Sequence, residues 1–281
     1  MTEAEVRLAT VQMNSGDDLK ENIDKAEAFI EAAVKEHSAD LVVVPEFFNI
    51  PYVFQWRDYA HIDRAEPADG PTITRMRELA RRHRIGVVAT IFEEEAAGLY
   101  YDTAFFIERD GSIVGKYRKV HPAAVQSLEK IYFRYGSYFP VFNYCGLKVG
   151  SVICYDTLFP ESARSVAVNG AELIVVPFAA PKLDAWRSMM ITRAFENGAW
   201  FAPTNKVGPE GEWTFGGSSM IVDPFGKVVA EMDDHSEGVI SATVTRSAAY
   251  SARREKPMFR DRRPDLYKPI CTNTEDIPGV V

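Results

Sequence analysis

The chain has 281 residues, of which 46% are hydrophobic and 26% charged, and its formal net charge is −8. A chain of this length and composition can bury one large core. The acidic balance argues against general binding to nucleic acid or to anionic membranes. No basic segment leads into an apolar one at the start, and no run reaches about 18 apolar residues, so neither a signal peptide nor a membrane span is expected.

The first half of the chain alternates strands with helices. Residues 6–13 form a predicted strand, residues 18–37 a helix capped by Asp17 or Asp18, and residues 41–44 a short strand buried on both faces. This β-α-β order predicts parallel neighbouring strands. A helix at 71–84, a strand at 85–92 and a hairpin of 104–107 with 113–117 are expected next.

The second half repeats this organisation without a clear sequence repeat. After a stretch that is mostly loop at 121–140, strands are expected at 147–153, 173–176, 200–203 and 238–244, and a hairpin at 219–222 with 227–231. Helices are expected at 161–169, closed by Gly170, and at 184–197, ended by Gly198. The tail from Thr245 reads as irregular. Two such halves fit an α/β fold with four α-β-β-α layers, as a single domain over residues 1–281.

Two buried strands end in a reactive side chain. Residues 41–46 read LVVVPE and deliver the carboxylate of Glu46, and residues 149–154 read VGSVIC and deliver the thiol of Cys154. Ligands of open α/β sheets bind outside the carboxyl ends of parallel strands. We therefore expect both groups at the same edge of the same layer.

Each group also has an ordinary interpretation. Glu46 could be a partly exposed strand end, and free cysteine is among the most buried residue types. Apolar neighbours such as Phe47, however, suit Glu46 to general-base catalysis. Cys154 precedes a predicted helix, whose N–H groups and positive end lower the pKa of a nearby thiol. Cys145 and Cys271 lack such a setting and are expected to be structural; three scattered cysteines indicate reduced thiols in a cytoplasm.

The base and cation that such a thiol needs are less clear from the residues alone. Of five histidines only His121 is well placed, so a Cys–His enzyme remains an alternative. Lys119 is either a solvated strand end or a cation that stabilises a thiolate and an oxyanion. The chain has no HExxH motif, Cys/His cluster or phosphate-binding glycine loop, so no metal, cofactor or nucleotide is expected.

Three blocks make the sequence resemble the nitrilase (carbon-nitrogen hydrolase) superfamily over nearly the whole chain. They are VVPEFF with Glu46, GKYRKVHP with Lys119 and VICYDTLFPE with Cys154, in the family's order. Further similar segments are EKIYFRYG, which begins at Glu129, RAFEN at 193–197 and GSSMIVDPFG at 217–226.

The resemblance implies a role for each of these residues. Glu46 would be the general base, Lys119 the oxyanion stabiliser and Cys154 the nucleophile. Glu129 would orient Lys119 and the substrate nitrogen, and the backbone N–H of Tyr155 would also hold the oxyanion.

Pocket walls are expected from the aromatic residues Phe47, Tyr52, Phe54 and Trp56, for which ordinary core packing is the alternative, and from Tyr155 and Phe178. The resemblance also implies the four-layer sandwich and a homodimer or higher homo-oligomer. The arginine-rich tail, residues 245–281, would pack on the partner subunit, with a solvated loose end as the alternative.

The nucleophile block bears on the branch of the family. Nitrilases usually carry Cys-Trp-Glu there, whereas this chain has Cys-Tyr-Asp at 154–156, more similar to amidases and carbamoylases. The segments EKIYFRYG and RRPDLY resemble N-carbamoyl amidohydrolases, including N-carbamoylputrescine amidases and β-ureidopropionases. N-carbamoyl-D-amino acid hydrolases have paired arginines just after this block, where this chain has Thr-Leu-Phe. A substrate carboxylate would need another cation, for which Lys182, Arg187 and Lys206 are candidates.

We therefore expect a hydrolase of non-peptide C–N bonds that works through a Glu-Lys-Cys triad and a thioester. The expected substrate is a small N-carbamoyl amine or N-carbamoyl amino acid, with release of ammonia and CO2. An aliphatic or ω-amidase acting on simple carboxamides is the alternative, followed by a nitrilase. A catalytically silent scaffold is the rival from a different class.

Overall fold

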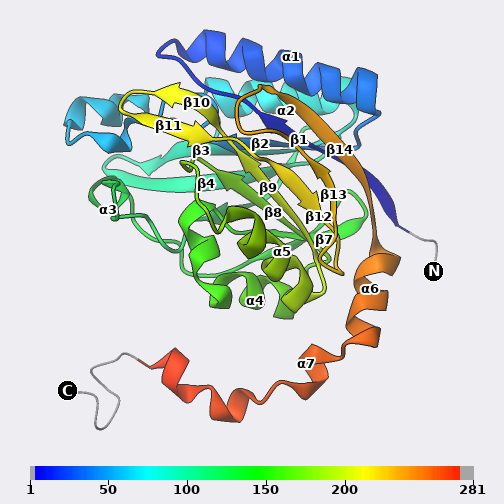
Figure 1. Cartoon of the computed structure of the whole chain (residues 1–281). Helices are drawn as coiled ribbons and strands as arrows, with labels where there is room; N and C mark the ends of the chain where they lie inside the picture. The colour runs from blue at the N-terminus through cyan, green and yellow to red at the C-terminus, as the bar shows by residue number, and fades with distance from the viewer. Residues whose placement is uncertain (1–3, 273–281) are drawn as a thin grey trace.

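The computed structural model describes residues 4–272 of the chain. Two six-stranded sheets face one another, and helices cover the outer face of each (Figure 1). The molecule is the four-layer α-β-β-α sandwich that the alternation of strands and helices predicts. Within the described part of the chain, none of the helices has the length and apolar character that a membrane crossing requires.

The first sheet has parallel strands at its centre and antiparallel strands at its edges. In spatial order its strands are β14 (Gly238–Thr245), β1 (Glu5–Gln12), β2 (Leu41–Glu46), β3 (Gly86–Ala96), β4 (Leu99–Ile107) and β5 (Ile113–Arg118). Strand β14 comes from the far end of the chain and pairs with β1 over its whole length, so it ties the two halves together.

The second sheet repeats this arrangement around the parallel strands β7, β8 and β9. In spatial order its strands are β13 (Val228–Glu231), β12 (Met220–Val222), β9 (Trp200–Asn205), β8 (Leu173–Phe178), β7 (Leu147–Ser151) and β6 (Val141–Tyr144). A separate two-stranded ribbon, β10 (Val207–Glu210) with β11 (Trp213–Gly216), follows β9.

Helices form the two outer layers. The helices α1 (Leu19–His37) and α2 (Pro71–His83) cover the first sheet, and α4 (Pro160–Val168) and α5 (Trp186–Asn197) cover the second (Figure 1). The remaining helices are α3 (Glu129–Tyr132), α6 (Arg246–Glu255), α7 (Met258–Asp261) and the 3-10 turns η1 (Val53–Gln55), η2 (Tyr59–Arg64), η3 (Cys154–Leu158), η4 (Pro264–Leu266) and η5 (Lys268–Cys271).

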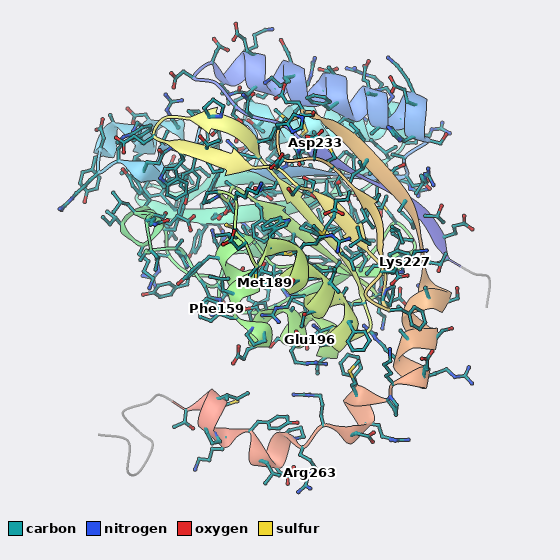
Figure 2. All side chains as sticks on the ribbon, viewed as in Figure 1. Phe159, Met189, Glu196, Lys227, Asp233 and Arg263 are labelled. Atoms are coloured by element: carbon teal, nitrogen blue, oxygen red, sulfur yellow. The ribbon has the colours of Figure 1, made fainter. Side chains whose placement is uncertain are left out.

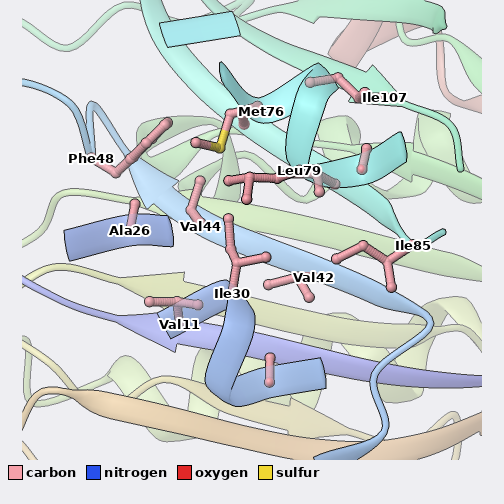
Figure 3. Close-up of a cluster of buried hydrophobic side chains, with 14 of the residues drawn as sticks. Val11, Ala26, Ile30, Val42, Val44, Phe48, Met76, Leu79, Ile85 and Ile107 are labelled. Atoms are coloured by element: carbon pink, nitrogen blue, oxygen red, sulfur yellow. The ribbon is translucent and has the colours of Figure 1, made fainter. Parts of the chain in front are cut away.

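Alternation along the strands explains how both faces of each sheet are buried. In β2, Val42 and Val44 pack against α1 and α2 beside Ile30 and Leu79 (Figure 3). Leu41 and Val43 point to the other face and pack between the sheets. A strand covered on both faces reads as one continuous apolar run, which is why 41–44 stands out in the sequence.

Several local predictions are confirmed. The Asp18 side chain caps α1 by accepting a hydrogen bond from the N–H of Glu21 at 2.9 Å. Gly198 ends α5 with a left-handed φ of 51°. Strands β1 and β2 are parallel, and β4 with β5 and β12 with β13 are antiparallel hairpins.

The prediction of an irregular tail from Thr245 is wrong for its first part. The Thr245 hydroxyl caps α6 by accepting from the N–H of Ala248, and Ala249 and Ala252 are buried on the inner side of this helix. Small alanines gave little helical signal next to the many arginines. Beyond α6, Phe259 still packs against the core of the second sheet, and the segment that follows extends from the body, as Arg263 in Figure 2 illustrates. Residues 273–281 of the tail lie outside the described residues.

The prediction that Glu46 and Cys154 share one layer is also wrong. Glu46 ends β2 in the first sheet, whereas Cys154 follows β7 in the second. The chain crosses to the other sheet after β5, so the two groups approach each other from facing sheets instead of from neighbouring strands.

Candidate active site

Glu46 is fully buried at the end of β2. All six residues of this strand are buried, so the carboxylate is delivered into the interior and not to solvent. Its Oε1 accepts a hydrogen bond from the ammonium of Lys119 over 2.7 Å.

Lys119 lies at the centre of a cluster of carboxylates. It follows β5, and its backbone N–H donates to the carbonyl of Asp102 on β4 at 2.9 Å. Its Nζ lies 2.7 Å from Glu46, 2.8 Å from Glu129 and 3.3 Å from Asp102. All four side chains have 0% exposure, so one ammonium is shared by three acid groups in the protein interior.

Glu129 is the first residue of the short helix α3. Its Oε2 accepts from the N–H of Ala123 at 2.7 Å and faces Lys119, and its Oε1 accepts from the Tyr52 hydroxyl at 2.6 Å. Both oxygens are therefore held in place, which fixes the direction from which the carboxylate meets the ammonium.

Cys154 stands at a sharp corner between β7 and α4. It begins the turn η3 and has a left-handed φ of 44°, a conformation that costs a residue with a side chain free energy and is typical of functional sites. The buried carboxylate of Asp156 holds the corner. It accepts from the N–H of Ile153 at 2.9 Å, the hydroxyl of Tyr117 at 2.6 Å and the N–H of His121 at 2.9 Å.

His121 is engaged with this same corner. Its Nδ1 lies 2.8 Å from Asp156, and its ring stacks on Phe159 with centroids 4.0 Å apart. These contacts indicate that His121 supports the turn. The charged groups that act most strongly on the pKa of the Cys154 thiol are Glu46, Lys119 and Glu129.

Burial and charge set the protonation of the cluster. Burial pulls the pKa of the Lys119 ammonium down, but Glu129 and Glu46 outweigh it and hold that pKa well above its ordinary value. Burial, and next the charge of Glu46, raise the pKa of the Asp102 carboxyl well above its usual range. Burial also raises the pKa of Glu129. Lys119 therefore stays a cation, and the raised pKa of Asp102 opposes the ionisation of that carboxyl.

The prediction of a lowered thiol pKa at Cys154 is wrong. Burial, and next the charge of Glu46, raise that pKa well above its ordinary value, while Lys119 and the backbone of Ala179 oppose the shift. The turn η3 has only five residues, so its aligned N–H groups supply little field. The raised pKa favours the thiol over the thiolate at this position.

A cavity of about 170 Å³ opens beside Cys154. Three of the predicted pocket residues line it, namely Tyr52, Tyr155 and Phe178. The other described lining residues are Ala123, Val125, Gln126, Ser127, Leu158, Ala179, Ala180, Pro181, Leu183, Met189 and Trp213.

Phe47 and Trp56 lie elsewhere, in contrast to the expectation that they form the pocket wall. The backbone turns after Glu46, where Phe47 has φ 51°, and its ring packs in an aromatic cluster with Phe54 at 4.8 Å between centroids. Trp56 packs beside His61 at 5.9 Å and over Gly211.

The three candidate cations for a substrate carboxylate are occupied by other acids. Lys182 pairs with Asp234 at 2.6 Å, and Arg187 with Glu231 at 3.3 Å. Lys206 is fully buried and pairs with Glu210 at 2.8 Å. Of the two cysteines expected to be structural, Cys145 is buried, but Cys271 is exposed.

Sequence reasoning missed Asp102 and the structural role of Asp156. Asp102 is a lone acid in the otherwise uncharged strand LYYDTAFFI, which was the available signal. One carboxylate oxygen from each of Asp102, Glu46 and Glu129 lies within 4.8 Å of the other two, a spacing suited to a metal ion. The Lys119 ammonium already lies among these oxygens, so the cluster is built around an organic cation.

Comparison with known proteins identifies the family of the chain. A family profile described as carbon-nitrogen hydrolase matches residues 7–254. The chain is 35% identical to N-carbamoylputrescine amidase of Arabidopsis thaliana, over 95% of this chain and 96% of that protein. It is 34% identical to 2-oxoglutaramate amidase of Bacillus subtilis, over 88% of this chain and 93% of that protein.

A solved structure gives the same result for the fold. The crystal structure of a carbon-nitrogen hydrolase from Helicobacter pylori G27 superposes with a TM-score of 0.90 at 30% identity, covering 96% of this chain and 99% of that one. The matches extend over nearly the full length of each chain, so they include both sheets and the cluster between them. This chain belongs to the carbon-nitrogen hydrolase family, within the nitrilase superfamily, and is an enzyme that hydrolyses carbon–nitrogen bonds.

Proposed function

We propose that the chain cleaves a linear amide or ureido C–N bond through a thioester on Cys154, with Glu46 as base and Lys119 as oxyanion stabiliser. The observation that carries this proposal is the buried ammonium of Lys119, 2.7 Å from Glu46 and 2.8 Å from Glu129, beside a thiol that lines a cavity. An acid–base group, a fixed cation and a nucleophile are the parts that acyl transfer requires.

Attack begins with the thiol proton. Glu46 takes this proton, and the sulfur of Cys154 forms a bond to the substrate carbonyl carbon. The carbonyl electron pair moves to oxygen, where the Lys119 ammonium and the backbone N–H of Tyr155 hold it. Losing one such donor typically costs about 3–4 kcal/mol of transition-state stabilisation.

Collapse of this intermediate breaks the C–N bond. The electron pair of that bond goes to nitrogen, which takes the proton now carried by Glu46 and leaves as ammonia. Glu46 then removes a proton from water, the resulting oxygen attacks the thioester carbon, and the C–S electron pair returns to sulfur with that proton. Glu129 keeps Lys119 directed at the oxyanion through both steps.

An N-carbamoyl compound is the substrate class we infer first. Attack on R–NH–CO–NH2 releases ammonia and leaves a carbamoyl thioester, which water converts to a carbamate that decays to the amine and CO2. The relative named N-carbamoylputrescine amidase supports this class. A simple carboxamide is the second candidate, supported by the relative named 2-oxoglutaramate amidase.

One experiment tests the mechanism and the class together. The wild type is incubated with N-carbamoyl amines, N-carbamoyl amino acids, simple carboxamides and nitriles, while ammonia and CO2 are measured and the intact protein is weighed by mass spectrometry. Cys154→Ala is expected to abolish turnover and the acyl adduct, whereas Cys145→Ala, the loss of another buried thiol, keeps both. Ammonia release by folded Cys154→Ala at the wild-type rate would contradict the proposal.

We also propose that the chain assembles as a homodimer through the segment 257–272. Leu266 and Ile270 on this segment are 62% and 63% exposed, on a part of the chain that extends from the body (Figure 1). Burying such side chains against a second copy is favourable. Light scattering of the full chain and of a form truncated after Lys256 tests this. The full chain is expected to be a dimer and the truncated form a monomer. The same oligomeric state for both forms would contradict the proposal.

A further inference from the structure

The cavity beside Cys154 is lined by apolar and uncharged side chains. Phe178 ends β8 on one side, Met189 projects from α5 (Figure 2), and Trp213 comes from the ribbon β10–β11. Among the described lining residues there is no Asp, Glu, Lys, Arg or His. The polar side chains there are those of Tyr52, Gln126, Ser127 and Tyr155, beside the thiol itself.

The rim of the cavity is largely apolar as well, with exposed Gln126 as an uncharged polar member. Val125, Leu158 and Leu183 line it and are 68%, 49% and 39% exposed. They come from three separate segments, the loop before α3, the turn η3 and the segment before α5, so their meeting is a product of the tertiary structure. Exposed apolar side chains gathered around one opening mark a binding surface for an apolar group.

Nearby charges are directed away from this cavity. Lys182 is next to Leu183 in the chain, but it pairs with Asp234 and lines a different surface cavity. Glu46, Lys119 and Glu129 have 0% exposure, are paired with one another and are not among the residues that line the cavity. A charged substrate end in this cavity would therefore lose water without gaining an opposite charge, which is unfavourable.

We propose that the group carried by the scissile amide or ureido carbonyl is uncharged and apolar, and that Val125, Leu158, Leu183 and Met189 select it. This inference rests on the proposed function for the bond that is broken, and it adds the chemistry of the rest of the substrate. It sets the chain apart from the relatives named for N-carbamoylputrescine, which ends in an amine, and for 2-oxoglutaramate, which ends in a carboxylate.

Matched pairs of nearly equal shape test the proposal. Pentanamide is compared with 4-aminobutanamide, and 4-methylpentanamide with succinamate; N-butylurea and N-isobutylurea are compared with N-carbamoyl-1,3-diaminopropane and N-carbamoylglycine. The neutral member of each pair is expected to have a kcat/KM about 100-fold higher or more, because the charged member buries an unpaired ion. A charged member turned over as well as its neutral partner would overturn the proposal.

Binding gives a readout that does not depend on turnover. Calorimetric titration of Cys154→Ala with the same pairs is expected to show the same preference for the neutral members. If nothing is hydrolysed and the neutral members still bind better, the proposed reaction fails and the inferred specificity stands. If the amides are hydrolysed without discrimination by charge, the reaction stands and the specificity fails.

A substitution at the rim locates the effect. Leu183→Arg is expected to raise the kcat/KM for succinamate about tenfold, because the exposed guanidinium supplies the missing cation. Val168→Arg makes the same change at a residue that is 47% exposed on α4 and outside the cavity lining, and it is expected to leave all ratios unchanged. Equal effects of the two variants would show that total charge, not this rim, sets the preference and would overturn the assignment of Leu183.

Discussion

The phenol of Tyr52 donates a 2.6 Å hydrogen bond to Oε1 of Glu129, whose other oxygen lies 2.8 Å from the Lys119 ammonium. Tyr52 also lines the cavity beside Cys154. One side chain therefore contacts both the space for the substrate and the carboxylate that positions the cation. The backbone N–H of Tyr52 is held in turn by Glu210 at 2.9 Å, and Glu210 pairs with buried Lys206.

Tyr52→Phe tests the link to Glu129. The ring stays in the cavity wall while the hydroxyl is lost, so kcat is expected to fall about tenfold, the value of one hydrogen bond to a charged acceptor. Tyr144→Phe is the matched control, because it removes a buried 2.8 Å hydrogen bond to the carbonyl of Ile107 away from the cavity. Steady-state kinetics should show full activity for the control, and equal losses in both variants would point to general destabilisation.

Glu129→Gln tests the charge that holds Lys119. The amide keeps the shape but removes one negative charge and one acceptor, so the ammonium is less firmly directed and kcat is expected to fall about 100-fold, with a smaller change in KM. Glu172→Gln is the control, since Glu172 is a buried glutamate that pairs with Arg246 at 2.7 Å on another part of the fold. It should lower Tm without lowering kcat. A Glu129→Gln enzyme with normal kcat would remove Glu129 from the mechanism.

Asp156→Asn tests the support of the nucleophile corner. The carboxylate accepts three hydrogen bonds, from the N–H groups of Ile153 and His121 and from the Tyr117 hydroxyl, and an amide cannot accept all three. The strained φ at Cys154 therefore loses its restraint. We expect Tm to fall by several degrees and kcat by about tenfold or more. The rate of Cys154 acylation by substrate, measured by mass spectrometry, should fall with kcat. Unchanged acylation together with a lower Tm would mean that Asp156 serves stability alone.

Cys145 provides a test of alkaline stability. Burial, and next the charge of Glu108, raise the pKa of its thiol from 9.0 to about 12. The folded state keeps this proton while the unfolded state loses it, so its contribution to stability falls as pH rises from about 9 toward 12. The slope approaches about 1.4 kcal/mol per pH unit from this group.

Denaturant unfolding between pH 8 and 10.5 measures that slope. Cys145→Ala is expected to be less stable at pH 8, since a buried sulfur is lost, but to have a flatter slope at high pH. The exposed Cys271→Ala is the control and should keep the wild-type slope. A slope in Cys145→Ala as steep as in the wild type would place the alkaline loss in other groups.

Local pattern was sufficient for the layers and for the strand ends at which Glu46 and Cys154 lie. Continuous apolar runs such as 41–44 mark strands buried on both faces, and capping by Asp18 and Gly198 follows from single residues. The sequence pattern did not predict the tail helix α6, because its buried side chains are alanines that lie among arginines. Periodicity carries little information where the buried side chains are so small.

The sequence by itself determined the α-β-β-α alternation, the strand ends that carry Glu46 and Cys154, and the family. Only the tertiary structure decided that these ends meet from facing sheets, that Asp102 joins the cluster at Lys119, and that the Cys154 pKa is raised. It also placed Phe47 and Trp56 away from the cavity and gathered Val125, Leu158 and Leu183 around its mouth. The reason is physical: backbone pattern is set by near neighbours in the chain, whereas burial and charge are summed over every group that the fold brings close.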